Sequence, residues 1–270
     1  MNIGIISDLH IDSNKDVTPS EYEAMLVDII KHSEIDLFII AGDISNHHAY
    51  SYEFVQRVQY QTAVQTLLVP GNHDLWDMDA EAPDTTSILN YFKSKPKCLI
   101  DEPFIINDEW AIVGHCGWYN YAFASDQFDL DRLSRKKFLG ATWQDKKHID
   151  WHESDIEVSR QFAKDIERDI KRVGDRKVIL ITHMVTHPDF VVPLPHRIFD
   201  YFNAFLGTTD IDDLYDTYNI PYSVMGHVHF RKRLQSPART YICPCLGYPR
   251  EWRTPDIKKE MIDAIQMIQI

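Results

Sequence analysis

Three features that would mark a membrane or nucleic-acid-binding protein are missing from this 270-residue sequence. No apolar run approaches the 18 or more residues that a membrane span needs. Asp8 and His10 interrupt the start of the chain, which excludes the apolar stretch of a signal peptide. Basic residues are in the minority, with 28 Lys and Arg against 41 Asp and Glu, so the formal charge is −13. We therefore expect no membrane partner and no general attraction to nucleic acid.

Cysteines are few, and repeats and Pro/Gly-rich linkers are absent. No Cys-x-x-Cys pair occurs among the four cysteines, which are Cys98, Cys116, Cys243 and Cys245. We expect reduced thiols in a cytoplasmic protein. Because no linker divides the chain, we expect one domain over residues 1–270. The least periodic part, residues 116–151, is interpreted either as a lid over a site or as a surface excursion without a role.

The residues that are present indicate an α/β protein. Hydrophobic residues make up 44% of the chain and charged residues 26%, as in soluble globular proteins. Short β-rich runs alternate with amphipathic helical stretches, which predicts a sheet with helices packed on it. The expected strands are 2–6, 36–40, 65–69, 104–107, 110–113, 177–181, 222–225, 230–234 and 240–243. The expected helices are 20–32, 52–60, 154–172 and 256–266.

Polar residues follow five of these strands directly. The five segments are Ser7-Asp8-Leu9-His10, Ala41-Gly42-Asp43, Pro70-Gly71-Asn72-His73-Asp74, Thr182-His183 and Gly226-His227-Val228-His229. In α/β sheets, ligands bind outside the carboxyl ends of the strands. Asp, Asn and His supply the oxygen and imidazole ligands that Mn, Fe and Zn accept. The sequence therefore predicts a metal site at this edge.

The spacing of these residues suits metal binding. Asp8 and His10 are two residues apart, as are His227 and His229, so each pair points to one side of an extended chain. Each pair can hold one ion or straddle two. The glycines within the motifs allow sharp turns and a close approach of the backbone to an ion. Each motif alone is weak evidence, but their combined order after apolar strands makes coincidence improbable.

Taken together, the motifs resemble the calcineurin-like metallophosphoesterase family. Its pattern is DxH, GD, GNH[DE], a lone His and GHxH, and all five occur here between residues 8 and 229. The segment 246–249 also resembles one found in small, uncharacterised bacterial members, although Cys243 replaces their Asn. The resemblance implies a sandwich of two mixed β-sheets flanked by helices.

The resemblance also implies a site for two divalent or mixed-valence transition metal ions, Mn, Fe or Zn. The first ion would be held by Asp8, His10, Asp43 and His229. The second would be held by Asp43, Asn72, His183 and His227, with Asp43 bridging. Two divalent ions against two carboxylates leave a local positive charge, which attracts phosphate and lowers the pKa of a bridging water.

The expected reaction is hydrolysis of a phosphate ester by attack of a metal-bridging hydroxide. In the family, a histidine at the position of His73 lies near the leaving group and can protonate it. Asp74 is expected either to orient the His73 ring by a hydrogen bond or to act only as a helix N-cap or turn Asp. The aromatic insertion favours a small phosphorylated substrate that is a diester or a nucleotide. No feature indicates the native metal or an oligomeric state.

Other residues are assigned a role only as alternatives. His115, His187 and His196 are expected either to form a substrate wall or to have no role there. Trp118, Tyr119 and Tyr121 are expected either to stack on a base or sugar or to pack within the insertion. The basic run 231–233 is interpreted as an anion-attracting patch or as a charged hairpin edge.

Two rival functions remain open at this stage. A catalytically inactive scaffold of the same fold is disfavoured because every expected metal ligand is intact. A DNA-processing nuclease is disfavoured by the charge of −13 and by the lack of a large C-terminal region, which makes nucleic acid a poor candidate partner.

Overall fold

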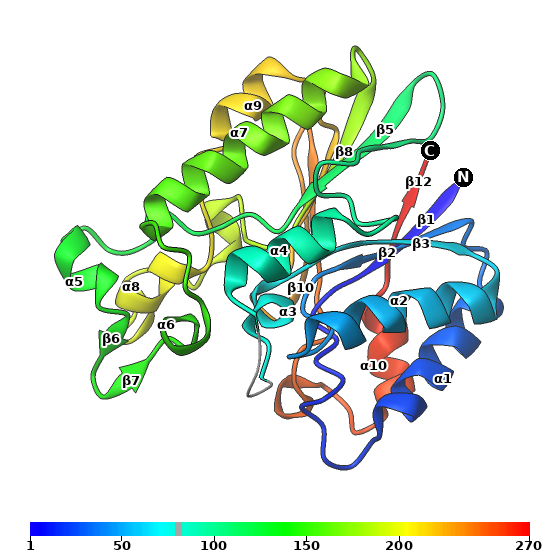
Figure 1. Cartoon of the computed structure of the whole chain (residues 1–270), viewed down its shortest axis with the longest axis horizontal. Coiled ribbons are helices and arrows are strands. Elements are labelled where there is room, and N and C mark those ends of the chain that lie inside the picture. The colour runs from blue at the N-terminus through cyan, green and yellow to red at the C-terminus, as the bar shows by residue number, and fades with distance from the viewer. Residues whose placement is uncertain (79–82) are drawn as a thin grey trace.

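Two mixed β-sheets pack face to face, with helices on their outer sides (Figure 1). The computed structural model describes residues 1–78 and 83–270. The first sheet has the order β12-β1-β2-β3, with β1 (Asn2–Ile6), β2 (Leu37–Ala41) and β3 (Gln65–Val69) parallel. β12 (Gln266–Gln269) pairs antiparallel with β1. This arrangement confirms the fold that the sequence predicts.

The second sheet has the order β10-β11-β9-β8-β5-β4. Its strands are β4 (Phe104–Ile105), β5 (Trp110–His115), β8 (Lys177–Thr182), β9 (Tyr222–Val224), β10 (Arg231–Gln235) and β11 (Thr240–Pro244). The four central strands are parallel, and the edge strands β4 and β10 are antiparallel to their neighbours. The two predicted hairpins, 104–113 and 230–243, are therefore both present.

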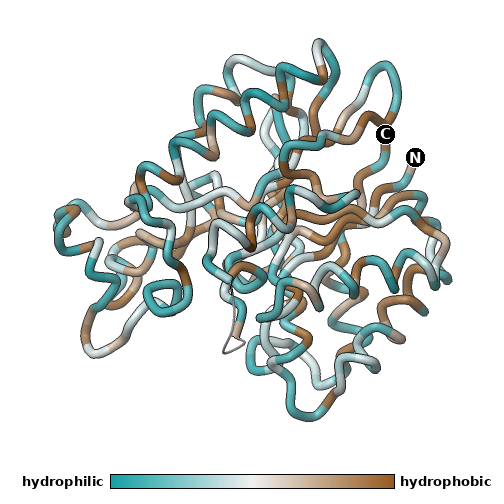
Figure 2. Tube along the Cα trace, viewed as in Figure 1, coloured by the Kyte–Doolittle hydropathy of each residue, from teal (hydrophilic) through white to brown (hydrophobic). Residues whose placement is uncertain are grey.

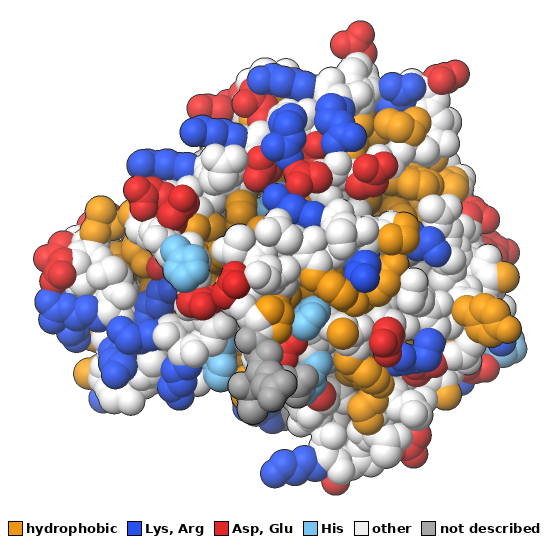
Figure 3. Space-filling view, in the orientation of Figure 1, with side chains coloured by type: hydrophobic (Ala, Val, Ile, Leu, Met, Phe, Trp, Pro, Cys, Tyr) orange, Lys and Arg blue, Asp and Glu red, His pale blue; other side chains and the backbone are white. Residues whose placement is uncertain are grey.

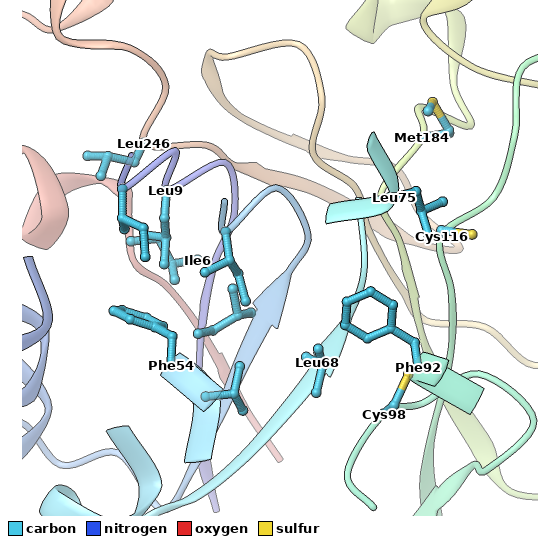
Figure 4. Close-up of a cluster of buried hydrophobic side chains, with 14 of the residues drawn as sticks. Ile6, Leu9, Phe54, Leu68, Leu75, Phe92, Cys98, Cys116, Met184 and Leu246 are labelled. Carbon is cyan, nitrogen blue, oxygen red and sulfur yellow. The ribbon is translucent and has the colours of Figure 1, made fainter. Parts of the chain in front are cut away.

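Hydrophobic residues pack between the two sheets and between the sheets and their helices, and Figure 2 shows that the central strands are the most hydrophobic stretches of the trace. Ile5 and Ile39 of the first sheet meet Ile112 and Ile181 of the second in one fully buried cluster. A second cluster joins the outer face of the first sheet to its helices, and Figure 4 shows part of it around Phe54. Because both faces of the parallel strands are covered, the strands are apolar over most of their length rather than alternating.

The helices start where the sequence supplies caps. α1 (Pro19–Lys31) and α7 (Asp155–Val173) both begin with a capping box, from Thr18 with Glu21 and from Ser154 with Glu157. The other α-helices are α2 (His48–Thr62), α3 (Asn72–Trp76), α4 (Thr85–Lys93), α5 (Leu130–Ser134), α6 (Asp145–His148), α8 (Phe199–Phe202), α9 (Asp212–Thr217) and α10 (Ile257–Ala264). Across the described ranges, no helix is both long and apolar enough to cross a bilayer.

The last expected helix is shorter than predicted. Residues 256–266 were expected to form one helix, but α10 ends at Ala264 and the chain turns into β12. In the run Gln266-Met-Ile-Gln269, Ile268 is buried against the first sheet, and burial alternates along the run as in a strand. Four residues are too few for this pattern to be distinguished from the preceding helix in the sequence.

The insertion is anchored by its aromatic residues. Trp118 and Tyr119 are fully buried, and the indole of Trp118 donates a hydrogen bond to Asp155 (2.8 Å). Tyr121 is also buried and donates to the same carboxylate, which pairs with Lys136 as well. Of the two alternatives for these rings, stacking on a substrate is therefore wrong, and packing within the insertion is confirmed.

His115 lies in the core and not in a substrate wall. It is 1% exposed, packs on Phe162, and its Nδ1 accepts a hydrogen bond from the Gly117 backbone N–H (3.1 Å). Burial, together with the charge of Lys93, lowers the pKa of His115 to about 3. Its neutral form is therefore part of the folded state.

This buried histidine should make the protein sensitive to mild acid. Below about pH 6.5, His115 binds a proton in the unfolded chain but not in the folded protein. The free energy of unfolding therefore falls by about 1.4 kcal/mol for each pH unit below that value. His115→Asn keeps an acceptor for Gly117 and removes the titration. When the pH is lowered from 7.5 to 5, the free energy of unfolding, measured with urea in the presence of EDTA, should fall by about 2 kcal/mol more in the wild type than in the variant. Equal falls in the two proteins would contradict this prediction.

Candidate metal centre

Residues from both sheets converge at one edge, as the sequence predicts. Asp8 and His10 follow β1, Asp43 follows β2, and Asn72 opens the helix after β3. The second sheet contributes residues that follow β8 and β9, namely His183, His227 and His229. The structure thus brings together all seven side chains that the sequence predicts as metal ligands.

The first group of potential ligand atoms belongs to Asp8, His10, Asp43 and His229. These atoms lie within 4.8 Å of one another. The Nε2 atoms of His10 and His229 are 3.0 Å apart, and His229 Nε2 is 3.4 Å from Asp8 Oδ1. His10 Nε2 is 3.7 Å from Asp43 Oδ2. Two imidazoles and two carboxylates around one point form a donor set that suits a divalent transition metal.

The second group shares Asp43 with the first and adds His183 and His227. His183 Nε2 is 3.3 Å from Asp43 Oδ2 and 3.2 Å from the Asn72 side-chain oxygen. Asn72 therefore completes this group. The carboxylate of Asp43 is the only side chain that belongs to both groups of the described residues.

The chemistry of these donors fits metal ions. Asp43 Oδ2 is buried and has no hydrogen-bond partner within the described part of the chain. The far nitrogens of three histidines are engaged, His183 with the Ala41 carbonyl (3.0 Å), His229 with Glu251 (2.9 Å) and His227 with the Phe205 carbonyl (3.1 Å). Their other nitrogens are left for a ligand, which is how metal-binding histidines are usually oriented.

Two of the site histidines, His183 and His229, have raised pKa values because they lie next to carboxylates. Burial opposes a charge on His229, but its bonds to Asp8 and Glu251 raise its pKa to about 10. Burial likewise opposes protonation of His183, and Asp43 raises its pKa to about 9. Burial and His183 lower the pKa of His227 to about 3. Metal binding must therefore displace protons from His183 and His229, so affinity should rise with pH.

The backbone of the site is strained. Five of the seven candidate ligands have positive φ angles, namely Asp8 (57°), His10 (43°), Asp43 (56°), His227 (72°) and His229 (54°). Such conformations are uncommon for residues with a side chain and cluster at functional sites, at a cost of about 1–3 kcal/mol each. The strained turns place polar side chains next to one another directly after buried strands.

Two motif glycines are required because neighbouring side-chain oxygens lie too close to their Cα atoms to leave room for a Cβ atom. A Cβ atom on Gly71 would lie 2.1 Å from Asp43 Oδ1, and one on Gly226 would lie 2.1 Å from Ser7 Oγ and 2.8 Å from Asp8 Oδ2. Any side chain at either position would push a carboxylate out of place. At these two positions the glycines are needed for close approach to the side chains of Asp43, Ser7 and Asp8, and approach of the backbone to an ion stays a prediction.

His73 lies beside the two groups. Its Nε2 is 4.0 Å from Asp43 Oδ2 and 3.5 Å from the Tyr248 hydroxyl, and its ring packs on Trp76. Its Nδ1 is 2.8 Å from the Asn46 side-chain oxygen. Burial and the surrounding histidines hold the pKa of His73 well below its usual range. The ring is held by Asn46, a residue that no motif points to.

Asp74 does not orient His73, which corrects the first of the two expectations for this residue. Its carboxylate accepts hydrogen bonds from the backbone N–H groups of Asp43 (2.8 Å) and Gly71 (2.7 Å), and from the hydroxyl of Ser51. Burial and the charge of Asp43 raise the pKa of Asp74 to about 6. Asp74 therefore ties the loop after β2 to the start of α3, close to the N-cap role that was the alternative.

Asp145, from the insertion, is a supporting residue that sequence reasoning missed. It is fully buried and accepts three hydrogen bonds, from the Asn72 amide (2.9 Å), the Trp76 indole (2.6 Å) and the Trp143 indole (2.7 Å). Because its Oδ1 takes the Asn72 amide, the Asn72 oxygen must face the candidate metal site. No sequence pattern links Asp145 to Asn72, since 73 residues separate them.

Removing this carboxylate should weaken metal binding. Asp145→Ala frees the Asn72 amide to rotate, so metal affinity should fall about 10–100-fold, as for other supporting partners of ligands. Asp145→Asn should lose less affinity than Asp145→Ala, because its oxygen can still accept from Asn72, although its amide replaces the acceptor of the Trp143 indole N–H. Calorimetric titration of each chelator-treated protein with Mn²⁺ measures this. Equal affinities in the wild type and Asp145→Ala would show that Asn72 needs no such support.

A cavity of about 500 Å³ opens onto the site. Its floor includes Asp43, Asn72 and His73. Its walls are mainly apolar and aromatic, and they include Trp76, Trp143, Val192, Phe199, Phe202, Leu206, Val228, Phe230 and Tyr248. None of His115, His187 and His196, all within the described residues, lines the cavity, so of the two alternatives the structure favours no role in its wall.

The basic run after the GHxH motif does not face this cavity either. Arg231 pairs with Glu260, the Lys232 ammonium donates to the Asp189 carbonyl, and Arg233 donates to the Met267 carbonyl. Of the two interpretations, the charged hairpin edge is confirmed.

Fold and site together define a calcineurin-like phosphoesterase: the model of this family matches residues 1–231, and the chain belongs to it. The acyl-carrier-protein phosphodiesterase PptH of Mycobacterium tuberculosis is 23% identical, over 92% of this chain and 78% of its own length. A probable cyclic nucleotide phosphodiesterase of Vesicomyosocius okutanii subsp. Calyptogena okutanii is 36% identical, over 26% of this chain and 31% of its own.

A solved structure shares the fold along almost the whole chain. The crystal structure of the phosphopantetheinyl hydrolase PptH from Mycobacterium tuberculosis superposes with a TM-score of 0.74. The match covers 99% of this chain and 95% of that one, at 18% sequence identity. The insertion and β12 thus belong to an architecture that another member of the family shares.

Proposed function

We propose that this protein hydrolyses a phosphodiester at a dinuclear metal centre. The observation that carries the proposal is the cavity, whose walls are mainly apolar and whose floor is formed by the candidate metal ligands. Arg250 is the only Lys or Arg side chain among its lining residues, and it is mostly exposed. A diester carries one negative charge and a monoester up to two. An apolar cavity with little positive charge of its own therefore favours the diester.

Each ligand group would hold one metal ion. Asp8, His10, Asp43 and His229 would bind the first, and Asp43, Asn72, His183 and His227 the second, with Asp43 shared. Bound there, the ions supply Lewis-acid stabilisation of the phosphoryl charge and an activated water nucleophile. Glu251 and the carbonyls of Ala41 and Phe205 hold the histidine rings in the orientation for binding.

His73 is the proposed general acid. Its Nε2 faces the candidate metal site, and its Nδ1 is fixed by Asn46. In the protonated ring, Nε2–H donates to the leaving oxygen as the phosphorus–oxygen bond breaks. Trp76 packs on the ring and limits its movement, so the proton is presented in one direction.

The substrate that the cavity favours has a slim, largely apolar group next to its phosphate. A volume of about 500 Å³ suits a group of the size of a small cofactor and excludes a folded domain. The two names given to one relative, PptH, are acyl-carrier-protein phosphodiesterase and phosphopantetheinyl hydrolase, and they point to a flexible arm joined to a protein. We propose an arm of this kind as the group that enters the cavity.

The test compares a diester with its monoester. Bis-p-nitrophenyl phosphate and p-nitrophenyl phosphate should be assayed with Mn²⁺, Fe²⁺ or Zn²⁺ added to chelator-treated protein. We expect metal-dependent turnover with a higher kcat/KM for the diester. A clear preference for the monoester would contradict the diester proposal, and activity in the presence of excess EDTA would contradict the metal proposal.

A further inference from the structure

One short stretch of the insertion reverses the charge of the protein. Residues 132–147 contain six Lys or Arg and one Asp, although the whole chain carries −13. This basic segment runs from the end of α5 through the hairpin of β6 (Lys137–Phe138) and β7 (Ala141–Thr142) to α6. Figure 3 shows Lys and Arg side chains gathered over the lobe that carries these elements.

The positive charge of the basic segment is available at the surface. Lys137, Lys146 and Lys147 are exposed, and none of the three has a carboxylate of the described residues within ion-pair distance. Asp145, the one acidic residue of the segment, is fully buried beneath them. Leu139, at the tip of the hairpin, is 63% exposed. An apolar tip among unpaired cations is a composition that suits contact with another molecule.

The same segment forms one wall of the catalytic cavity. Residues 141–144 line the cavity, and the Lys147 ammonium donates to the side-chain oxygen of Gln144 (3.0 Å). On another side, Arg250 lines the cavity and lies over the ring of Tyr248. A molecule held on the basic segment would therefore stand next to the opening that leads to the metals.

We infer that the basic segment docks a small acidic protein whose phosphodiester-linked arm enters the cavity. The inference rests on the proposed function, because it names the carrier of the same substrate. The candidate ligands Asp8 and Asp43 are fully buried, so the scissile phosphate must arrive on a slim arm while its carrier stays outside. The outer lysines then attract the carrier by charge, and the apolar walls accept the arm.

An acidic protein fits this surface better than a nucleic acid. Lys137, Lys146 and Lys147 lie on one hairpin and one short helix of a protein with a net charge of −13, a patch too small to follow an extended phosphate backbone. A compact carrier needs only a patch of the size of one hairpin and one helix.

The test uses the metal-loaded enzyme and two forms of acyl carrier protein as the acidic probe. The holo form presents a phosphodiester-linked arm, and the apo form lacks the arm and cannot be hydrolysed. The variant Lys137→Glu/Lys146→Glu/Lys147→Glu should raise KM for the holo form about tenfold or more and abolish binding of the apo form. Turnover of bis-p-nitrophenyl phosphate should stay within about twofold of wild type, because none of the three lysines lines the cavity.

A matched variant controls for net charge. Lys15→Glu/Lys31→Glu/Lys164→Glu changes the charge equally at exposed sites outside the basic segment and should leave all three measurements unchanged. Hydrolysis of bis-p-nitrophenyl phosphate without binding of either carrier form would overturn the docking inference and leave the diester proposal standing. Carrier binding that depends on the three lysines, without any diester hydrolysis, would support docking and overturn the proposed reaction. Tighter lysine-dependent binding of a single-stranded oligonucleotide than of the carrier would overturn docking of a protein.

Discussion

Replacing Asp43 by Asn should remove both metal ions together. Among the described residues, Asp43 is the one side chain that belongs to both ligand groups, and its Oδ2, which has no hydrogen-bond partner there, lies 3.3 Å from His183 and 3.7 Å from His10. An amide there carries no charge to offset two cations. We expect the affinity of both sites to fall by more than about 100-fold, beyond the loss seen when only a supporting residue is removed, and phosphoesterase activity to be lost with them.

The measurement is metal content per chain after equilibration at a fixed free concentration of Mn²⁺. The control is His227→Ala, which removes a ligand from the second group only and should leave about one ion bound. One ion retained in Asp43→Asn would show that Asp43 is not shared. No change in either variant would place the metals elsewhere.

The importance of His73 should depend on the leaving group. An alkoxide needs a proton in the transition state, whereas p-nitrophenolate largely does not. His73→Ala should therefore lower kcat on an alkyl phosphodiester by about 10²–10⁴-fold, the usual contribution of general acid catalysis, and by clearly less on a p-nitrophenyl diester. Metal content should stay near that of the wild type because His73 belongs to neither ligand group.

The companion variant Asn46→Ala separates orientation from proton transfer. Asn46 contacts the Nδ1 atom of His73 but not the candidate ligands, so its loss should reproduce the same dependence on leaving group with a smaller effect. Equal losses on both substrates in His73→Ala would assign His73 to substrate positioning instead. A lost metal ion would make it a ligand.

The sequence predicted the parts of the site that are encoded locally. Each candidate ligand lies within five residues of the end of a buried strand, and the strands themselves are short, largely apolar runs. Parallel strands end at the same edge of a sheet, so their order was enough to bring Asp8 and Asp43 together. His183 follows a strand of the second sheet, and its place beside them depends on how the two sheets pack. The glycines were also recognisable because their motifs fix them beside the carboxylates.

The supporting residues could not be predicted, because their roles depend on contacts between distant segments. Asn46 and His73 are 27 residues apart, His229 and Glu251 are 22 apart, and Asp145 reaches Asn72 across 73 residues. The acidic residue next to His73 in sequence, Asp74, was the natural candidate to orient it. Its carboxylate turns instead to the backbone amides of the loop after β2.

The pairing of β12 with β1 also has a consequence for how the chain folds as it is synthesised. β1 is made first and finds β2 early, but its other edge stays open until residues 266–269 leave the ribosome. An open, apolar strand edge invites association with other nascent chains. Asp8 and His10 follow this strand directly, so the turn that carries half of the first ligand group rests on a sheet that is completed last.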